Sequence, residues 1–133
     1  MDYRTDLPDA QELAVLFDTT GWYASAPVTA DELRRATANS SFWLVGYDGD
    51  RLVGFGRVVT DGVMHAMIYD LIVHPDHQNR GIGGDILAYL VDKCLELGIR
   101  DIQLFCAAGK RRFYEKRGFV ARPDDAPGMQ YAR

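Results

Sequence analysis

The sequence predicts a mixed α/β domain in which helices cover both faces of a central sheet. Three observations support this class. Apolar residues first recur at helical spacing, then at the spacing of strands, and two Asp-Gly pairs divide the strand region. An amphipathic helical segment then separates the third strand from a fourth. The predicted order is two helices, three strands, a helix, a strand, a helix and two short strands, with the sheet mostly antiparallel.

Two short helices are predicted near the start of the chain, after a short strand at residues 3–5. Each begins with a capping-box pattern, in which an N-cap residue is followed three positions later by glutamate. The two pairs are Asp9 with Glu12, and Thr29 with Glu32. In the first helix, Leu13, Leu16 and Phe17 share one face, which we expect to be buried.

The next region predicts an antiparallel meander of three strands. Asp48-Gly49 joins the first two strands and Asp61-Gly62 leads into the third, at residues 63–73. Asp-Gly between alternating segments is a strong hairpin signal, because both residues tolerate a positive φ. All three strands should therefore be neighbours in the sheet.

A longer helix is predicted after the meander, with its apolar residues at Ile82, Ile86, Leu87, Leu90, Val91, Cys94 and Leu95 and its end at Gly98. The strand at residues 101–106 follows a crossover helix and should run parallel to the third strand. A short helix in residues 110–119 comes next. Two last strands are expected at Phe119-Val120 and at residues 129–133.

The composition places bounds on the protein's class. The chain has 133 residues, 47% of them hydrophobic and 26% charged, which predicts one folded domain over residues 1–133. A formal net charge of −4 argues against a nucleic-acid partner. Without a signal peptide or an apolar run of membrane-spanning length, we expect a cytoplasmic protein with no membrane partner. Cys94 and Cys106 are interpreted as buried free thiols, and no metal site is expected.

A glycine-rich stretch lies between the third strand and the long helix. Gly81, Gly83 and Gly84 fall at the predicted helix start, where free N–H groups and the helix dipole attract an anion such as phosphate. Packing of the helix against the sheet is the structural alternative. A P-loop is excluded because no Gly-Lys-Ser/Thr occurs, and a dinucleotide fingerprint would need glycine where Ile86 stands.

The sequence from Gln78 to Gly83, in the context LIVHPDHQNRGIGGDIL, resembles the acetyl-CoA-binding motif Q-x-x-G-x-G/A of the GCN5-related N-acetyltransferase (GNAT) superfamily. The segment FYEKRGF, residues 113–119, looks like a second motif of that family. Together the motifs cover about the C-terminal half of the chain. The resemblance implies the GNAT fold, acetyl-CoA as co-substrate, and transfer of its acetyl group to a primary amine of a small molecule or a peptide.

The resemblance also implies roles for particular residues. The cofactor-binding set it implies is Leu71, Ile72, Val73, Gln78, Asn79, Arg80, Gly81, Ile82, Gly83, Gly84 and Tyr114. A strand amide near Ile72 would polarise the thioester carbonyl. Tyr114 matches the position of the family's acid, although packing beside Phe113 is the alternative.

The general base is open at this stage. Asp70 is the leading candidate, since alternation places it on the strand face opposite Leu71, but it is also a candidate loop cap. His65 is a weaker candidate on the same strand, and Met67 stands where lysine-acetylating relatives carry glutamate. His74 and His77 flank Pro75 and are interpreted as structural.

Two further questions concern the acceptor and the strength of catalysis. The aromatic residues Trp22, Tyr23, Phe42, Trp43 and Phe55 are either an acceptor wall or core. Ala107 stands where many family members carry a cofactor-binding asparagine. That departure supports an alternative function, a CoA-binding regulatory module without efficient turnover. A homodimer is a possible assembly. The meander and the C-terminal GMQYAR are similar to plant plastid acetyltransferases that act on serotonin-like amines and proteins.

Overall fold

The computed structural model describes residues 1–133. In chain order the elements are β1 (Asp2–Arg4), α1 (Ala10–Asp18), α2 (Ala30–Ala38), β2 (Phe42–Asp48), β3 (Arg51–Thr60), β4 (His65–Val73), a 3-10 turn (Pro75–His77), α3 (Ile82–Glu96), β5 (Asp101–Leu104) and α4 (Arg111–Glu115). Residues 1–103 and 104–133 form two compact units. The expectation of one domain therefore stays a prediction.

The strands form one five-stranded sheet in the order β1-β2-β3-β4-β5. The first four strands pair antiparallel, and both predicted Asp-Gly turns join neighbouring strands. β5 runs parallel to β4, since the amide of Asp101 donates a 2.9 Å hydrogen bond to the carbonyl of Met64, so both strands begin at the same end. The predicted mixed sheet is confirmed.

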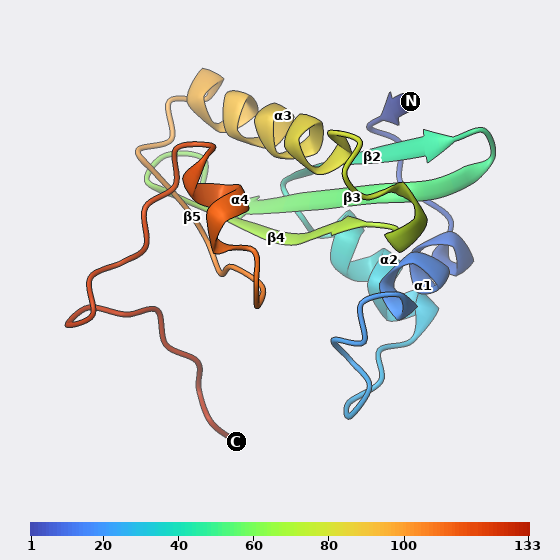
Figure 1. The fold of residues 1–133 in the computed structure, drawn as a ribbon, viewed down its shortest axis with the longest axis horizontal. Coiled ribbons are helices and arrows are strands. Elements are labelled where there is room, and N and C mark those ends of the chain that lie inside the picture. Colours follow the sequence, from blue (N-terminus) through green and yellow to red (C-terminus); the bar gives the residue numbers. More distant parts are fainter. The chain divides into compact units, whose positions relative to one another are not determined.

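Helix α3 lies on one face of the sheet, and α1 and α2 lie on the other (Figure 1). Close packing of α3 depends on Gly54 and Gly56 of β3. A Cβ at Gly54 would come within 2.8 Å of Ile86 Cδ1, and one at Gly56 within 3.0 Å of Leu90 Cδ1. The opposite face packs against the helices through a buried core of Leu13, Leu16, Phe17, Leu33, Val45, Tyr47, Leu52, Phe55 and Ile72.

The helix starts follow their sequence signals to different degrees. The capping box of α2 is complete, with Thr29 accepting from the amide of Glu32 and Glu32 accepting from the amide of Thr29. At α1, Asp9 caps the amide of Gln11, but Glu12 instead accepts a 2.7 Å hydrogen bond from the hydroxyl of Tyr47. Glu12 therefore joins helix to sheet.

None of the helices has the length and apolar character needed to span a bilayer.

Four expectations are wrong in detail. No strand forms at Phe119-Val120 or at residues 129–133, where Val120, Met129 and Tyr131 are 89%, 84% and 86% exposed. Phe119 is partly buried, but its ring packs on Tyr114, and the exposed residues after it have no buried face to hold them in a sheet. β5 ends at Leu104, so Cys106 lies outside it and is exposed, unlike the buried Cys94. In α3, Leu95 is exposed and not part of the buried face.

Candidate active site

β4 contains a bulge at the point where the sequence predicted the site. Phe55 pairs with Ile72 and Arg57 pairs with Tyr69, so the single residue between them on β3 faces two residues of β4, Asp70 and Leu71. Asp70 has a φ of 54°, a conformation that non-glycine residues adopt infrequently. Strain of this kind persists where the surrounding structure holds it, and it concentrates at functional sites.

The bulge determines which way the neighbouring side chains point. Leu71 lies on the α3 face, because its Cδ1 is among the atoms closest to a Cβ built at Gly56. Asp70 lies on the opposite face, where it contacts Arg57. Because the extra residue interrupts alternation, both Tyr69 and Asp70 reach the same arginine. The predicted orientation of Asp70, away from Leu71, is confirmed.

Arg57 and Asp70 form a largely buried ion pair. Arg57 Nε donates to Asp70 Oδ2 at 2.8 Å, and the two side chains are 19% and 12% exposed. A second guanidinium nitrogen, Nη1, donates to Ser40 Oγ at 3.2 Å, and the guanidinium carbon lies 5.1 Å from the centre of the Tyr69 ring. The charge of Asp70 is thus offset while the carboxylate keeps a defined orientation.

Tyr23 is the second aromatic residue at this pair. Burial raises the pKa of its hydroxyl, the negative charge of Asp70 raises it further, and the positive charge of Arg57 lowers it. These effects show that the Tyr23 hydroxyl lies within electrostatic reach of both members of the ion pair. Tyr23 and Tyr69 are each 38% exposed, which leaves part of both rings open beside the ion pair.

The end of β4 presents unpaired backbone groups. β5 is only four residues long and begins beside the start of β4, so Leu71–Val73 extends past it. His74 N–H points toward β3, where it donates to the carbonyl of Val53 at 2.8 Å. Alternation then directs the amide of Val73 away from β3. The donor expected near Ile72 stays a prediction, and Val73 is the neighbouring residue whose amide points away from β3.

The loop after β4 leaves the start of α3 open to an anion. Gly81 is the N-cap in the left-handed conformation, with φ 83°, and no side chain caps the helix. The first hydrogen bond of the helix runs from Asp85 N to Gly81 O, so the amides of Ile82, Gly83 and Gly84 have no acceptor within the helix. Residues 78–81 are exposed. This arrangement fits a phosphate group.

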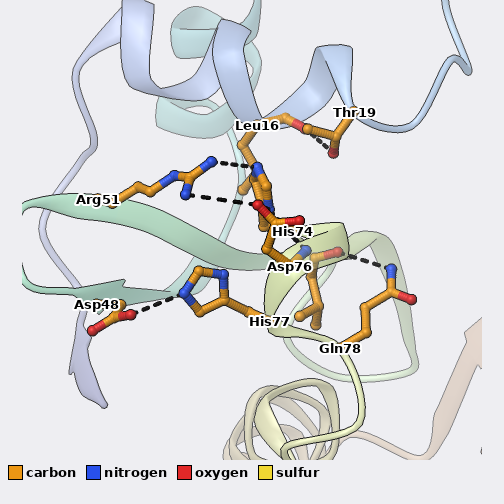
Figure 2. Close-up of polar contacts among 9 residues, drawn as sticks. Leu16, Thr19, Asp48, Arg51, His74, Asp76, His77 and Gln78 are labelled. Atoms are coloured by element: carbon orange, nitrogen blue, oxygen red, sulfur yellow. Dashed lines mark hydrogen bonds and ion pairs between the residues drawn. The ribbon is translucent and has the colours of Figure 1, made fainter.

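Other contacts hold this loop in place. Gln78 Nε2 donates to the carbonyl of Val73 at 3.2 Å, so this predicted cofactor residue supports the loop itself. Asn79 adopts a φ of 63°, which turns the chain toward the helix. His74 and His77 are 9% and 6% exposed and contact the β2–β3 hairpin (Figure 2). Their predicted structural role agrees with this burial.

Tyr114 lies in the C-terminal unit. It belongs to α4 and is 9% exposed, with its ring 5.0 Å from that of Phe113 and 5.9 Å from that of Phe119 in edge-to-face geometry. Burial raises the pKa of its phenol to about 12, and proximity to Cys106 adds to the effect. The hydroxyl is therefore protonated at neutral pH.

His65 and the aromatic residues of the proposed acceptor wall lie at different places in the fold. His65 lies at the start of β4, exposed, and contacts Asp101 at 3.1 Å, so it is far along the strand from Asp70. Phe55 is fully buried core, and the indole N–H of Trp43 donates to the carbonyl of Asp6. Of the proposed aromatic wall, Tyr23 is the residue whose pKa responds to the charges of Asp70 and Arg57.

Sequence reasoning missed Arg57, Tyr69, Asp48 and Arg51. No motif marks them. The one relevant signal in the sequence was the Asp48-Gly49 turn, because a hairpin at that turn pairs Asp48 with Arg51.

Comparison with known proteins identifies the fold and its chemistry. The profile of the Acetyltransferase (GNAT) family matches residues 7–119. The chain belongs to this family. It is similar to the uncharacterized N-acetyltransferase ycf52 of Pyropia yezoensis, with 33% identity over 122 residues that cover 89% of this chain and 68% of that protein. As a GNAT member it is an acyltransferase that uses acetyl-CoA.

Two further comparisons bear on this GNAT chain. The chloroplastic serotonin N-acetyltransferase 2 of Oryza sativa subsp. japonica is 33% identical over 107 residues, covering 77% of this chain and 54% of that protein. The structure of a GNAT-family acetyltransferase from Streptococcus pneumoniae superposes with a TM-score of 0.83 at 26% identity, covering 99% of this chain and 97% of that one. The predicted GNAT fold is confirmed.

Proposed function

We propose that this GNAT protein transfers the acetyl group of acetyl-CoA to a primary amine by direct attack within a ternary complex. The observation that carries the proposal is the bulge in β4. It brings a carboxylate on the α1 face, Asp70, next to Leu71–Val73, the segment of β4 that extends past the short strand β5. A proton acceptor and donors for a carbonyl oxygen are the groups that acyl transfer to an amine requires.

The residues that would hold acetyl-CoA follow from the unpaired backbone groups. The pyrophosphate would be bound by the amides of Ile82, Gly83 and Gly84, with Arg80 available for a charge-assisted contact. The pantetheine arm would pair with Leu71–Val73 of β4, as an added strand would. An N–H of Leu71 or Val73 would then donate to the thioester carbonyl and stabilise the oxyanion that forms there.

The reaction requires a neutral amine. The nitrogen attacks the carbonyl carbon, a C–N bond forms, the C–S bond breaks, and the nitrogen must lose a proton. We assign that proton to Asp70, directly or through water. Its Oδ2 is held by Arg57, so the role is to orient the amine and accept its proton as the tetrahedral intermediate develops positive charge on nitrogen.

Tyr114 is proposed to act on the departing sulfur. With a pKa of about 12, its phenol is a weaker acid than a thiol, whose ordinary pKa is about 8.5. Complete proton transfer from Tyr114 to a thiolate is therefore unfavourable. We assign it the role of a hydrogen-bond donor that stabilises the thiolate as it leaves, while Asp70 takes the single proton that the amine loses and solvent protonates the released thiolate.

The surroundings of Asp70 favour an aromatic acceptor. Two partly exposed rings, Tyr23 and Tyr69, adjoin the pair, and Arg57 offsets the charge that would otherwise attract a polycation. Offset or edge-to-face contacts between aromatic rings contribute about 0.5 to 1.5 kcal/mol beyond simple burial. The relative named as a serotonin N-acetyltransferase is consistent with an arylalkylamine.

The test is an assay of free CoA thiol with a panel of acceptors: arylalkylamines, polyamines and lysine-containing peptides. The proposal predicts amine-dependent release of CoA, fastest with an arylalkylamine, and an N-acetyl product by mass spectrometry. Tight binding of acetyl-CoA without release for any acceptor would instead support the regulatory module that Ala107 suggests.

A further inference from the structure

A pair of residues joins the loop before α3 to the far end of the β2–β3 hairpin. The imidazole Nε2 of His77 lies 2.9 Å from Oδ2 of Asp48 (Figure 2). His77 is the last residue of the 3-10 turn, directly before the exposed segment 78–81, and Asp48 is the last residue of β2. The two residues are 29 positions apart in sequence, so this contact is tertiary.

A second contact from the same hairpin end reaches the same loop. Arg51, the first residue of β3 and the cross-strand partner of Asp48, places Nη2 at 2.7 Å from His74 Nε2 and Nη1 at 4.0 Å from the carboxylate of Asp76 (Figure 2). The amide of Asp76 in turn donates to His74 Nδ1 at 3.1 Å. Both ends of the 3-10 turn are thus fixed to one hairpin.

The burial of His77 shows which way its ring is held. Its Nδ1 is buried without a hydrogen-bond partner, whereas Nε2 faces a carboxylate. A carboxylate only accepts, so Nε2 carries the hydrogen and Nδ1 carries a lone pair. The ring therefore has one hydrogen bond, to Asp48, and it also packs edge-to-face against His74, with the ring centroids 5.7 Å apart. A buried polar atom left unpaired is costly, which favours a role for this histidine beyond filling space.

We infer that Asp48 and His77 are positioning residues that hold the loop from Gln78 to Gly81 in the conformation that binds the pyrophosphate of acetyl-CoA. This inference rests on the function proposed above. Without the contact, the loop samples other conformations, and the apparent dissociation constant rises in inverse proportion to the fraction that remains competent. The effect should fall on cofactor affinity alone, because Asp48 and His77 face neither Asp70 nor Arg57.

The experiment compares Asp48→Ala with Asp50→Ala, using calorimetric titration of CoA. Both substitutions remove one exposed carboxylate from the same end of the hairpin, but the Asp50 side chain forms no hydrogen bond or ion pair. Loss of a hydrogen bond to a charged group predicts roughly tenfold weaker CoA binding for Asp48→Ala. Asp50→Ala should bind like the wild type. Asp48→Asn should recover most of the affinity, since its amide oxygen still accepts from Nε2–H.

Kinetics separate positioning from general loosening of the fold. The KM for acetyl-CoA should rise with the dissociation constant, while the KM for the amine and the kcat at saturation stay within about twofold. The double variant, with His77→Gln and Asp48→Ala, should lose little more CoA affinity than either single variant, because the two residues act as a pair. Circular dichroism checks that each variant is folded. If Asp48→Ala is not folded, His77→Gln, which removes the imidazole from the same contact, takes its place.

Two results would overturn the inference. One is equal CoA affinity in Asp48→Ala and Asp50→Ala when the wild type binds CoA. The other is a parallel rise in the KM for the amine, which would mean that the whole site has loosened. Failure of the wild type to bind CoA at all would remove the proposed function itself, and the inference with it.

Discussion

Arg57 of β3 and Asp70 of β4 form an ion pair with an N–O distance of 2.8 Å, and Asp70 has a backbone φ of 54°. In a regular antiparallel ladder the cross-strand neighbour of Arg57 is a single residue, Tyr69. The bulge places Asp70 and Leu71 opposite Gly56 and turns Asp70 to the face of Arg57, so one guanidinium contacts both an aromatic ring and a carboxylate. The local irregularity of β4 thus builds the acceptor side of the site.

Replacing Asp70 with Asn tests its role as proton acceptor. The amide oxygen still accepts from Arg57, so the fold should remain, but the group no longer takes a proton. We expect kcat to fall by roughly 10² or more, the usual contribution of a general base, with CoA affinity unchanged. Steady-state kinetics and calorimetric titration measure the two quantities. An unchanged kcat with every amine tested would assign the proton to another group.

Tyr114→Phe removes the proposed donor to the thiolate. Packing against Phe113 and Phe119 is kept, so stability and CoA affinity should change little. Loss of one preorganised donor predicts a fall in kcat of roughly 10². Because the pKa of Tyr114 is raised to about 12, the pH profile below about pH 10 should keep its shape in the variant. A shifted alkaline limb would show that Tyr114 itself titrates in the wild type.

Gly83→Glu places a carboxylate in the first turn of α3, beside the amides assigned to the pyrophosphate. Like charges repel, and the side chain also obstructs the backbone, so CoA binding should weaken by about 10² or more. Gly83→Ala is the control, since it adds a methyl group without charge and favours the helix. Calorimetry on both folded variants measures the difference. Full affinity in Gly83→Glu would place the phosphate site elsewhere.

The turn between β3 and β4 predicts a pH effect on stability. Asp61 accepts hydrogen bonds from the amides of Val63, Met64 and His65, which lower the pKa of its carboxyl below the ordinary 3.8. A carboxyl with a lowered folded-state pKa stabilises the fold above its unfolded pKa, and the contribution is lost as pH falls through the folded pKa. The stability gap between wild type and Asp61→Asn should therefore narrow on acidification.

Urea unfolding from about pH 6 down to about pH 3 measures that gap. A gap that stays constant over this range would show that the carboxylate charge contributes nothing to the turn.

Much of the fold was predictable because its signals are local. Asp48-Gly49 and Asp61-Gly62 form the expected turns, with both glycines at positive φ, and Gly98 ends α3 in the same way. Thr29 and Glu32 form the expected box. The two strands expected at the end of the chain do not form, because their formation would depend on a pairing partner and not on a local signal. A strand exists only if a neighbour pairs with it, and nothing within residues 119–133 specifies that neighbour.

In the site, too, the features that depend on local sequence were predictable and the contacts between distant segments were not. The open start of α3 follows from three glycines and a missing cap, which are visible in the sequence. The pairing of Arg57 with Asp70 depends on a bulge that no glycine marks, and the contact of His77 with Asp48 joins segments 29 positions apart. Such contacts arise from register and loop closure, so residue spacing alone does not predict them.

The central claim is that this GNAT chain binds acetyl-CoA specifically, and thermal unfolding with and without the ligand tests it most directly. At a hundred times its dissociation constant, acetyl-CoA should stabilise the fold by about 2.7 kcal/mol, a shift in Tm of roughly 10 °C for a domain of this size. NAD at the same concentration should produce no shift. Equal shifts with both ligands, or none with acetyl-CoA, would contradict the account.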